Sequence, residues 1–408
     1  MKLFPHQEKV LDQTYYYNRV AYYLDMGLGK TFVGSEKMWE LNTPYNLVIC
    51  QKSKIGDWKE HFEHHYPEYQ VIVFDKQSID RIPEESILII NYDKVWRRPE
   101  LEKLRHFTLM LDESSMIKNE KSNRSKFILS LAADNVILLS GTPTGGKYEE
   151  LWSQLHLLGW NIKKELFMNQ FVIQEWDDLN QKFKITGYKN VERLKKKLRQ
   201  YGAVFMKTDE VFDLPPMNEQ IIKITSTKQY TDFAKDHIIE IDNELLLGDT
   251  AASKKMYLRQ LASVYNQNKL QYVKDLIDST NDRIIIFYNF KKEYATLVDL
   301  IDRPISSING DIKDLTAYEQ EENSITLIQY QAGAMGLNLQ KANKIIYFSL
   351  TDKSELFEQS KKRINRIGQE RPCFYYFPLT KGSIEWRMKE VLEQRKDYTD
   401  ELFEEEEM

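Results

Sequence analysis

Two short stretches of this chain carry residue types that can work on a phosphate. The first is LDMGLGKT, in which Gly27 and Gly29 precede Lys30. Glycines let a loop curl so that its N–H groups point at a phosphate, and a following helix adds the positive end of its dipole. A lysine here reaches the β- and γ-phosphates of a nucleotide, and the hydroxyl of Thr31 would hold Mg²⁺. Position 24 is leucine, so the match is to the shorter GxGK[ST] form of the pattern.

The second stretch is TLMLDESSMIKN, in which Asp112 and Glu113 end an apolar run. It lies about 80 residues after the loop, as expected for a neighbouring strand of one sheet. A phosphate-loop enzyme needs such a strand to supply a carboxylate for Mg²⁺ and a second carboxylate for the attacking water. A strand that ends in an ordinary acidic turn would have the same sequence pattern. The phosphate loop earlier in the chain favours the interpretation as a catalytic site.

Three weaker motifs fit the same chemistry. LSGTP (139–143) ends another apolar run with hydroxyl groups, although such a turn is commonly only a turn. LFPHQ places Gln7 after a proline, where its amide can read an adenine edge. In QSKKRINRIGQ (359–369), Arg363 and Arg366 are three residues apart and would share a helix face, an arrangement suited to a phosphate. A solvated basic helix would give the same pattern.

The elements that must position these residues are short apolar runs separated by stretches with helical spacing, such as 291–301. Short apolar runs are typical of buried parallel strands. The alternation of such runs with helical stretches occurs twice, which predicts two doubly wound α/β lobes. The predicted strands are 46–50, 71–74, 87–90, 108–111 and 136–139, then 283–287, 325–328, 344–348 and 374–377.

Between the two sets, residues 145–281 are expected to be mostly helical. The prolines of DLPP (213–216) break that pattern and mark the junction between the lobes. We predict an N-terminal lobe at 1–207, a connector at 208–224 and a C-terminal lobe at 225–408.

Composition narrows the class of protein. The chain has 408 residues, 42% hydrophobic and 29% charged, with a formal charge of −5, so a nucleic-acid partner would be held by local basic patches. Two distant cysteines, Cys50 and Cys373, indicate a reducing compartment. No run approaches a membrane span and the N-terminus has no apolar signal region. We therefore expect a cytoplasmic protein.

Taken in order, the motifs resemble those of the superfamily-two helicase-like ATPases, specifically the Swi/Snf-type branch of double-stranded-DNA translocases. The resemblance covers nearly the whole chain. It rests on LFPHQ, LDMGLGKT, LVICQKSKIGDWKEHF, LDESSMIKN, LSGTPTGGKYEELW, DLPP, IIIFYNF, INGD, YQAGAMGLNLQKANKIIYF and QSKKRINRIGQ. It implies two RecA-like lobes with helical insertions, a DNA-dependent ATPase using ATP and Mg²⁺, and duplex DNA as the partner.

The resemblance also assigns roles residue by residue. It implies nucleotide contacts from Gln7, Met26, Gly27, Leu28, Gly29, Lys30, Thr31 and Gly336, and Mg²⁺ ligands Thr31 and Asp112. It implies catalytic roles for Lys30, Asp112, Glu113, Arg363 and Arg366. It implies contacts to DNA phosphates from Lys52, Ser53, Lys54, Lys118, Asn119 and Gln331. The basic stretch 181–207, with nine Lys or Arg and one acidic residue, is either a further DNA contact or the solvent-exposed face of a helix.

The chain departs from the pattern of this branch after the acidic pair, where Ser114 and Ser115 replace Ala-His or Ala-Gln. Further departures are at Gln51, Tyr330, Gln331 and Lys362. The chain thus resembles a diverged, compact member of the branch, and such a member suits the cytosol of a bacterium or of a phage-infected host. We expect hydrolysis to survive, whereas its coupling to the LSGTP turn and the second lobe is open. Two alternatives to a duplex translocase are a strand-separating DNA or RNA helicase and an ATP-gated clamp that has lost hydrolysis. Trp58, Trp152 and Trp160 are interpreted as core residues.

Overall fold

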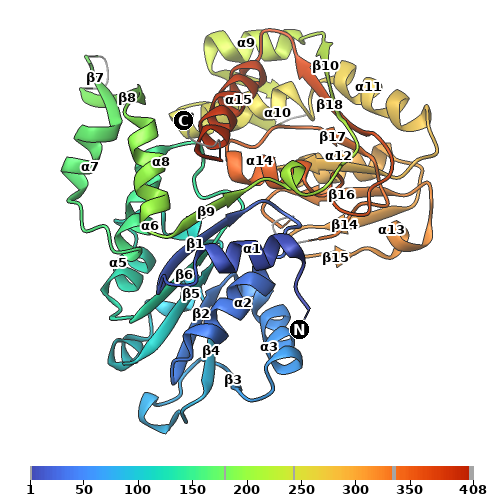
Figure 1. Ribbon diagram of the computed structural model, residues 1–408. Helices are drawn as coiled ribbons and strands as arrows, with labels where there is room; N and C mark the ends of the chain where they lie inside the picture. Colours follow the sequence, from blue (N-terminus) through green and yellow to red (C-terminus); the bar gives the residue numbers. More distant parts are fainter. Residues whose placement is uncertain (1, 179–180, 242–243, 333–336, 404–408) are drawn as a thin grey trace. The chain divides into compact units, whose positions relative to one another are not determined.

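The computed structural model describes residues 2–178, 181–241, 244–332 and 337–403, and it divides into two compact units (Figure 1). The first unit comprises the chain up to Phe212 together with the end of the C-terminal helix from Asp397, and the second unit is Asp213–Lys396. Among these residues, no helix combines the length and the apolar character that crossing a membrane requires.

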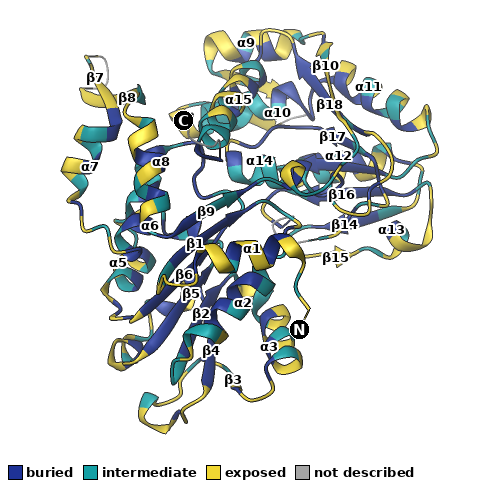
Figure 2. Cartoon of the chain, in the orientation of Figure 1, coloured by how far each residue is buried: buried dark blue, intermediate teal, exposed yellow. Residues whose placement is uncertain are grey.

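The first unit is built on a seven-stranded sheet whose strands all pair in parallel. In sheet order the strands are β3 (Gln70–Val73), β4 (Ser86–Asn91), β2 (Tyr45–Cys50), β5 (Phe107–Asp112), β6 (Asn135–Leu139), β1 (Arg19–Leu24) and β9 (Ala203–Met206). Side chains of one strand alternate between two cores: Val20 and Tyr22 enter one, and Ala21 and Tyr23 enter the other. Burial on both faces explains why these strands read as continuous apolar runs (Figure 2).

Helices cover both faces of this sheet. Residues of α1 (Pro5–Gln13), α2 (Lys30–Leu41) and α3 (Ile55–His65) pack into the core that contains Tyr22. The core that contains Tyr23 receives α4 (Tyr92–Val95), α5 (Asn123–Ser130), α6 (Trp152–Leu157), α7 (Lys164–Phe171) and α8 (Val191–Gln200). A separate antiparallel hairpin, β7 (Val172–Asp177) with β8 (Lys182–Tyr188), presents mainly exposed residues (Figure 2).

The second unit repeats the plan with another seven-stranded sheet, parallel except at its β14–β15 edge. Its order is β10 (Met217–Ile224), β18 (Cys373–Thr380), β17 (Lys344–Tyr347), β13 (Ile284–Tyr288), β16 (Ile325–Gln329), β14 (Ile305–Ile308) and β15 (Lys313–Asp314). Its helices are α9 (Lys228–Asp236), α10 (Ala251–Ala262), α11 (Gln267–Asp278), α12 (Lys291–Leu300), α13 (Thr316–Gln320), α14 (Ser354–Lys361) and the part of α15 (Ile384–Phe403) up to Lys396. A hairpin pairs β11 (Ile238–Ile241) with β12 (Glu244–Leu247).

The two predicted doubly wound lobes are therefore confirmed, and each predicted apolar run forms a strand. The expectation that residues 145–281 are mostly helical was wrong in part, because four hairpin strands and two sheet strands lie there. These strands are short or mostly exposed, so they lack the buried apolar run that marks a central strand.

The end of the chain belongs to the first unit, whereas the predicted C-terminal lobe included it. Leu402 and Phe403 are buried in the core around Tyr23. The hydroxyl of Tyr148 donates to Glu401 Oε2 at 2.5 Å, and it lies 2.9 Å from the carbonyl oxygen of Tyr398. Apolar burial and this hydrogen bond attach the segment from Asp397 to the first unit.

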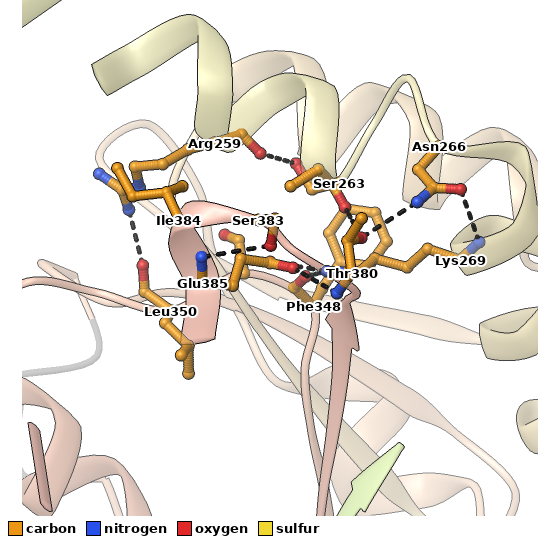
Figure 3. A network of polar contacts seen from close by, with 12 residues as sticks. Arg259, Ser263, Asn266, Lys269, Phe348, Leu350, Thr380, Ser383, Ile384 and Glu385 are labelled. Atoms are coloured by element: carbon orange, nitrogen blue, oxygen red, sulfur yellow. Dashed lines mark hydrogen bonds and ion pairs between the residues drawn. The ribbon is translucent and has the colours of Figure 1, made fainter. Parts of the chain in front are cut away.

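A buried ion pair organises the second unit (Figure 3). Lys269 Nζ donates to Glu385 Oε1 at 2.7 Å and to the carbonyl oxygen of Phe348 at 3.1 Å. The other oxygen of Glu385 accepts from the backbone N–H of Thr380 at 2.9 Å. The side chain of Asn266 donates to the Thr380 hydroxyl at 3.0 Å. These bonds fasten α11 and the start of α15 to β17 and β18.

Candidate active site

The phosphate loop lies between the end of β1 and the start of α2. Gly27 has φ 91° and Gly29 has φ 75°, values in the left-handed region that glycine adopts without strain. Gly29 is the N-cap of α2, so the unsatisfied N–H groups of the first helical turn open toward the loop. This arrangement is suited to binding an anion at the helix N-terminus.

Gln7 lies against the phosphate loop. Its Nε2 donates to the carbonyl oxygen of Leu28 at 3.2 Å, and Nε2 of His6 lies 3.1 Å from the same oxygen. The backbone N–H of Phe4 donates to Gln7 Oε1 at 3.0 Å, which fixes the amide orientation. A Cβ atom at Gly29 would lie 2.1 Å from Gln7 Nε2. A side chain at position 29 would therefore displace the Gln7 amide, and the left-handed φ of this residue separately favours glycine.

Lys30 is held at the carboxyl end of β1. Its Nζ donates to the carbonyl oxygens of Leu24 and Asp25 at 2.8 and 3.2 Å. A Cβ atom at Gly141 would lie 3.3 Å from the same nitrogen, so the LSGTP turn after β6 runs beside the lysine. The three strands that end at this site, β5, β6 and β1, are neighbours in the sheet.

Asp112 ends β5 with one carboxylate oxygen already oriented. Trp58 Nε1 on α3 donates to Asp112 Oδ2 at 2.9 Å, and the hydroxyl of Tyr92 donates to the Asp112 carbonyl oxygen at 2.9 Å. Burial raises the pKa of Asp112, and the Trp58 bond and the charges of Lys30 and Lys54 oppose that rise. Trp58 is buried as predicted, but its interpretation as a core residue alone was incomplete, because it also positions the carboxylate.

Glu113 begins the turn after β5 in an unusual conformation. Its φ and ψ are 57° and 60°, the left-handed region, which costs a residue with a Cβ about 1 kcal/mol. The 3₁₀ turn Ser114–Ile117 follows directly. The left-handed residue therefore lies between the end of β5 at Asp112 and the start of this turn, where the chain changes direction.

The donor chemistry at this site fits Mg²⁺. Thr31 opens α2 and Asp112 ends β5, and their hydroxyl and carboxylate oxygens are the hard ligands this ion prefers. Within the described ranges, no group of three or more His, Cys, Asp and Glu side chains forms a dedicated metal site. Mg²⁺ is commonly bound by one or two protein oxygens, with water and substrate phosphates completing its shell.

Two sequence comparisons bear on this site. A family profile for the SNF2-related domain matches residues 24–274, and one for the helicase conserved C-terminal domain matches residues 268–368. The chain belongs to the SNF2-related family. The first match contains the phosphate loop and the acidic pair, and the second reaches Arg366.

Similar proteins come from distant organisms. This SNF2-related chain is 25% identical, over 89% of its length, to the ATP-dependent DNA helicase DDM1 of Arabidopsis thaliana. It is 24% identical, over 97% of its length, to a Caenorhabditis elegans homologue of SWI/SNF-related matrix-associated actin-dependent regulator of chromatin subfamily A-like protein 1. It spans 56% and 61% of the lengths of these two relatives. The solved Sulfolobus solfataricus SWI2/SNF2 ATPase core in complex with dsDNA aligns over 98% of this chain and 92% of that one, with a TM-score of 0.48 and 22% identity.

The arginine pair of the SNF2-related chain lies in the second unit and is not on a helix, contrary to the prediction. Helix α14 ends at Lys361, and the backbone N–H of Leu339 donates to the Arg363 carbonyl oxygen at 3.1 Å, which removes that oxygen from a helical ladder. Nη1 of Arg363 and Nη1 of Arg366 nevertheless lie 3.3 and 3.4 Å from one acceptor, the carbonyl oxygen of Leu337. The predicted nucleotide contact Gly336 lies outside the described residues.

The predicted DNA contacts are divided between the two units. Lys52 and Ser53 are exposed in the 3₁₀ turn Lys52–Lys54, and Gln331 is exposed after β16 of the second unit. Lys54 Nζ forms an ion pair with Asp57 at 2.7 Å. The remaining two predicted contacts follow the acidic pair.

These two residues, Lys118 and Asn119, also form contacts within the protein. Lys118 Nζ lies 3.9 Å from Glu150 Oε2, which accepts from the backbone N–H of Gly145 at 2.7 Å. The side-chain oxygen of Asn119 accepts from the backbone N–H of Lys121 at 3.1 Å, an arrangement that stabilises a turn.

Sequence reasoning missed one support of the phosphate loop. Thr208, which is buried beyond β9, donates from its hydroxyl to Asp25 Oδ2 at 3.0 Å and approaches the Met26 carbonyl oxygen at 3.1 Å. The other oxygen of Asp25 accepts from the backbone N–H of Met26 at 2.8 Å. Nothing in the stretch KTDE around Thr208 marks it, because its partner lies far away in the sequence.

A histidine supports the helix that carries the loop. Ser35 donates to the Thr31 carbonyl oxygen at 2.7 Å, and its oxygen lies 2.9 Å from His61 Nε2, so the neutral imidazole donates from Nε2. Burial lowers the pKa of His61 to about 4, and the neighbouring His65 and His64 contribute in the same direction.

We predict that the first unit loses stability as the pH falls from about 6.5 to about 4. In that window the unfolded chain binds a proton at His61 that the folded chain does not bind. The contribution should be about 1–2 kcal/mol after allowance for solvent screening at this partly exposed ring. The free energy of unfolding in urea, measured at pH 7 and at pH 5, gives this contribution. Hydrogen exchange of α3 at the two pH values shows whether it arises near His61. His61→Gln should reduce the pH dependence, and a slope equal to that of the wild type would contradict the assignment.

Proposed function

We propose that this chain is an ATP-hydrolysing translocase on double-stranded DNA, which remodels DNA or protein–DNA complexes without separating the strands. The observation that carries the proposal is the position of Lys30 and the Asp112–Glu113 pair at the carboxyl ends of β1 and β5, which flank β6, with Gln7 of α1 hydrogen-bonded to the phosphate loop. The family assignment and the name of the Arabidopsis relative, an ATP-dependent DNA helicase, support it.

The side chains divide the chemistry as follows. The N–H groups at the start of α2 and the ammonium of Lys30 bind the phosphates of ATP, and Gln7 contacts the adenine. Thr31 and Asp112 would hold Mg²⁺, which supplies charge neutralisation on the phosphates when bound. Glu113 orients the attacking water and accepts its proton. Arg363 and Arg366 remain our candidates for stabilising the charge on the transferred phosphoryl group.

Exposed basic and polar side chains at Lys52 and Ser53 would contact DNA phosphates, which gives affinity with little sequence information. Cys50 and Cys373 are free and buried, as expected in a reducing compartment, and we propose the cytoplasm as the location.

The proposal is tested by measuring phosphate release from ATP with no nucleic acid, blunt duplex DNA, single-stranded DNA or RNA. We expect duplex DNA to stimulate turnover and Lys30→Ala to abolish it. A second assay follows displacement of a third DNA strand from a triplex, together with unwinding of an overhanging duplex. Triplex displacement without unwinding supports the translocase. Unwinding would instead support a helicase, and ATP binding without phosphate release would support a clamp.

A further inference from the structure

Gln154 on α6 joins three segments of the candidate site by hydrogen bonds. Its Oε1 lies 3.0 Å from the hydroxyl of Tyr23 on β1 and 2.7 Å from the hydroxyl of Ser114 in the turn after the acidic pair. Its Nε2 lies 2.7 Å from the carbonyl oxygen of Pro143 in the LSGTP turn. The side chains of Gln154, Ser114 and Tyr23 are fully buried.

The chemistry of the partners fixes the direction of each bond. The carbonyl oxygen of Pro143 can only accept, so the amide nitrogen of Gln154 must face it. The amide oxygen therefore accepts from the two hydroxyl groups. Burial raises the pKa of Tyr23, so its hydroxyl keeps the proton that it donates. Reversing the amide would place two acceptors against each other, so this geometry has one stable arrangement.

We propose that Gln154 is a positioning residue that couples the LSGTP turn to the Asp112–Glu113 turn through Ser114. The proposal rests on the proposed function, because it assigns the internal link of that site. A displacement of Pro143 moves the Gln154 amide, which displaces Ser114 and the adjoining Glu113. Tyr23 provides the fixed reference, since it lies in β1 immediately before Leu24, the residue whose carbonyl oxygen holds Lys30.

The chain offers a matched control in the residue next to Gln154. The hydroxyl oxygen of Ser153 is buried and has no hydrogen-bond partner. Ser114→Ala and Ser153→Ala therefore remove the same atom from equally buried sites, and only the first removal breaks a hydrogen bond. A fall in kcat that is caused by general repacking should therefore appear in both variants.

The test compares Ser114→Ala, Ser153→Ala, Gln154→Leu and the double variant Ser114→Ala with Gln154→Leu. For Ser114→Ala we expect about a five- to ten-fold fall in DNA-stimulated kcat relative to Ser153→Ala, with KM for ATP within about two-fold. Hydrogen exchange of residues 139–147 should become faster in Ser114→Ala and not in Ser153→Ala. The double variant should be no slower than Gln154→Leu alone, because both changes break one link.

The outcomes separate this inference from the proposed function. If the wild type responds to DNA and Ser114→Ala matches Ser153→Ala in kcat and in hydrogen exchange, the coupling role is wrong and the function stands. If the wild type shows no turnover, the proposed function fails, and the exchange of residues 139–147 decides the role of Gln154 by itself: faster exchange in Ser114→Ala supports it, and unchanged exchange overturns it. If Gln154→Leu does not fold, the two serine variants still decide.

Discussion

Glu113→Gln is expected to lower kcat for ATP hydrolysis by about a thousand-fold while ATP binding changes by only a few-fold. Removing a general base typically costs 10²–10⁴ in rate. Glutamine retains the size of the side chain and suits the same left-handed backbone no worse than glutamate, so the turn after β5 should persist. The amide loses only the ability to accept a proton from the attacking water.

The measurement pairs single-turnover phosphate release with the binding of a fluorescent ATP analogue. Glu84→Gln serves as the control and should behave as the wild type, because Glu84 is exposed and precedes the amino end of β4, at the sheet edge opposite the site. A variant of Glu113 with wild-type turnover would show that another group accepts the proton. Loss of binding together with turnover would indicate that Glu113 holds the site together and does not act as the base.

Lys269→Met is expected to destabilise the second unit by about 3–5 kcal/mol. The side chains of Lys269 and Glu385 are 0% and 2% exposed, and removal of one partner leaves the other charge buried without compensation. Burial alone already raises the pKa of Glu385, and the charge of Lys269 is the main influence that opposes the rise. Without the lysine, Glu385 must either take up a proton or remain charged in the core.

Native-state hydrogen exchange of β13 and β17 reports the opening free energy of the unit that contains the pair. Lys291→Met is the matched control, because its ion pair with Asp311 at 3.3 Å joins side chains that are 91% and 77% exposed. Exposed pairs contribute at most about 1 kcal/mol. Adding Glu385→Gln to Lys269→Met should recover part of the lost stability of the second unit. No recovery would show that the lysine acts through its own packing or its bond to Phe348.

The fold could be predicted from the sequence where burial leaves a clear pattern. Strands covered on both faces, such as β4 and β13, appear as unbroken apolar runs because no position along them meets water. The edge strand β10 has mostly exposed residues and reads as an ordinary polar stretch. The exposed hairpin β7–β8 also lacks an unbroken apolar run, so its two strands were not predicted and lie in a region predicted to be helical.

The candidate site could be predicted as a set of residues but not as a set of contacts. Lys30 and Asp112 are recognisable because phosphate chemistry requires those residue types and because each lies in a recognisable local motif. The partners Trp58, Thr208 and Gln154 come from distant segments, and only the packed structure brings them to the site. The arginine pair shows the opposite case: both side chains reach Leu337, although the expected helix ends before them.

The first unit is discontinuous in the sequence, since its final segment begins at Asp397. A ribosome that has added Phe212 has synthesised every strand of the first sheet, but Leu402 and Phe403, which are buried in the core of that unit, have yet to be made. At ~5–20 residues per second, synthesis of the second unit delays them by on the order of ten to forty seconds. During that interval the partners of Phe205 and Tyr148 in the last turns of α15 are missing, so the nascent first unit has uncovered apolar surface of the kind that promotes aggregation.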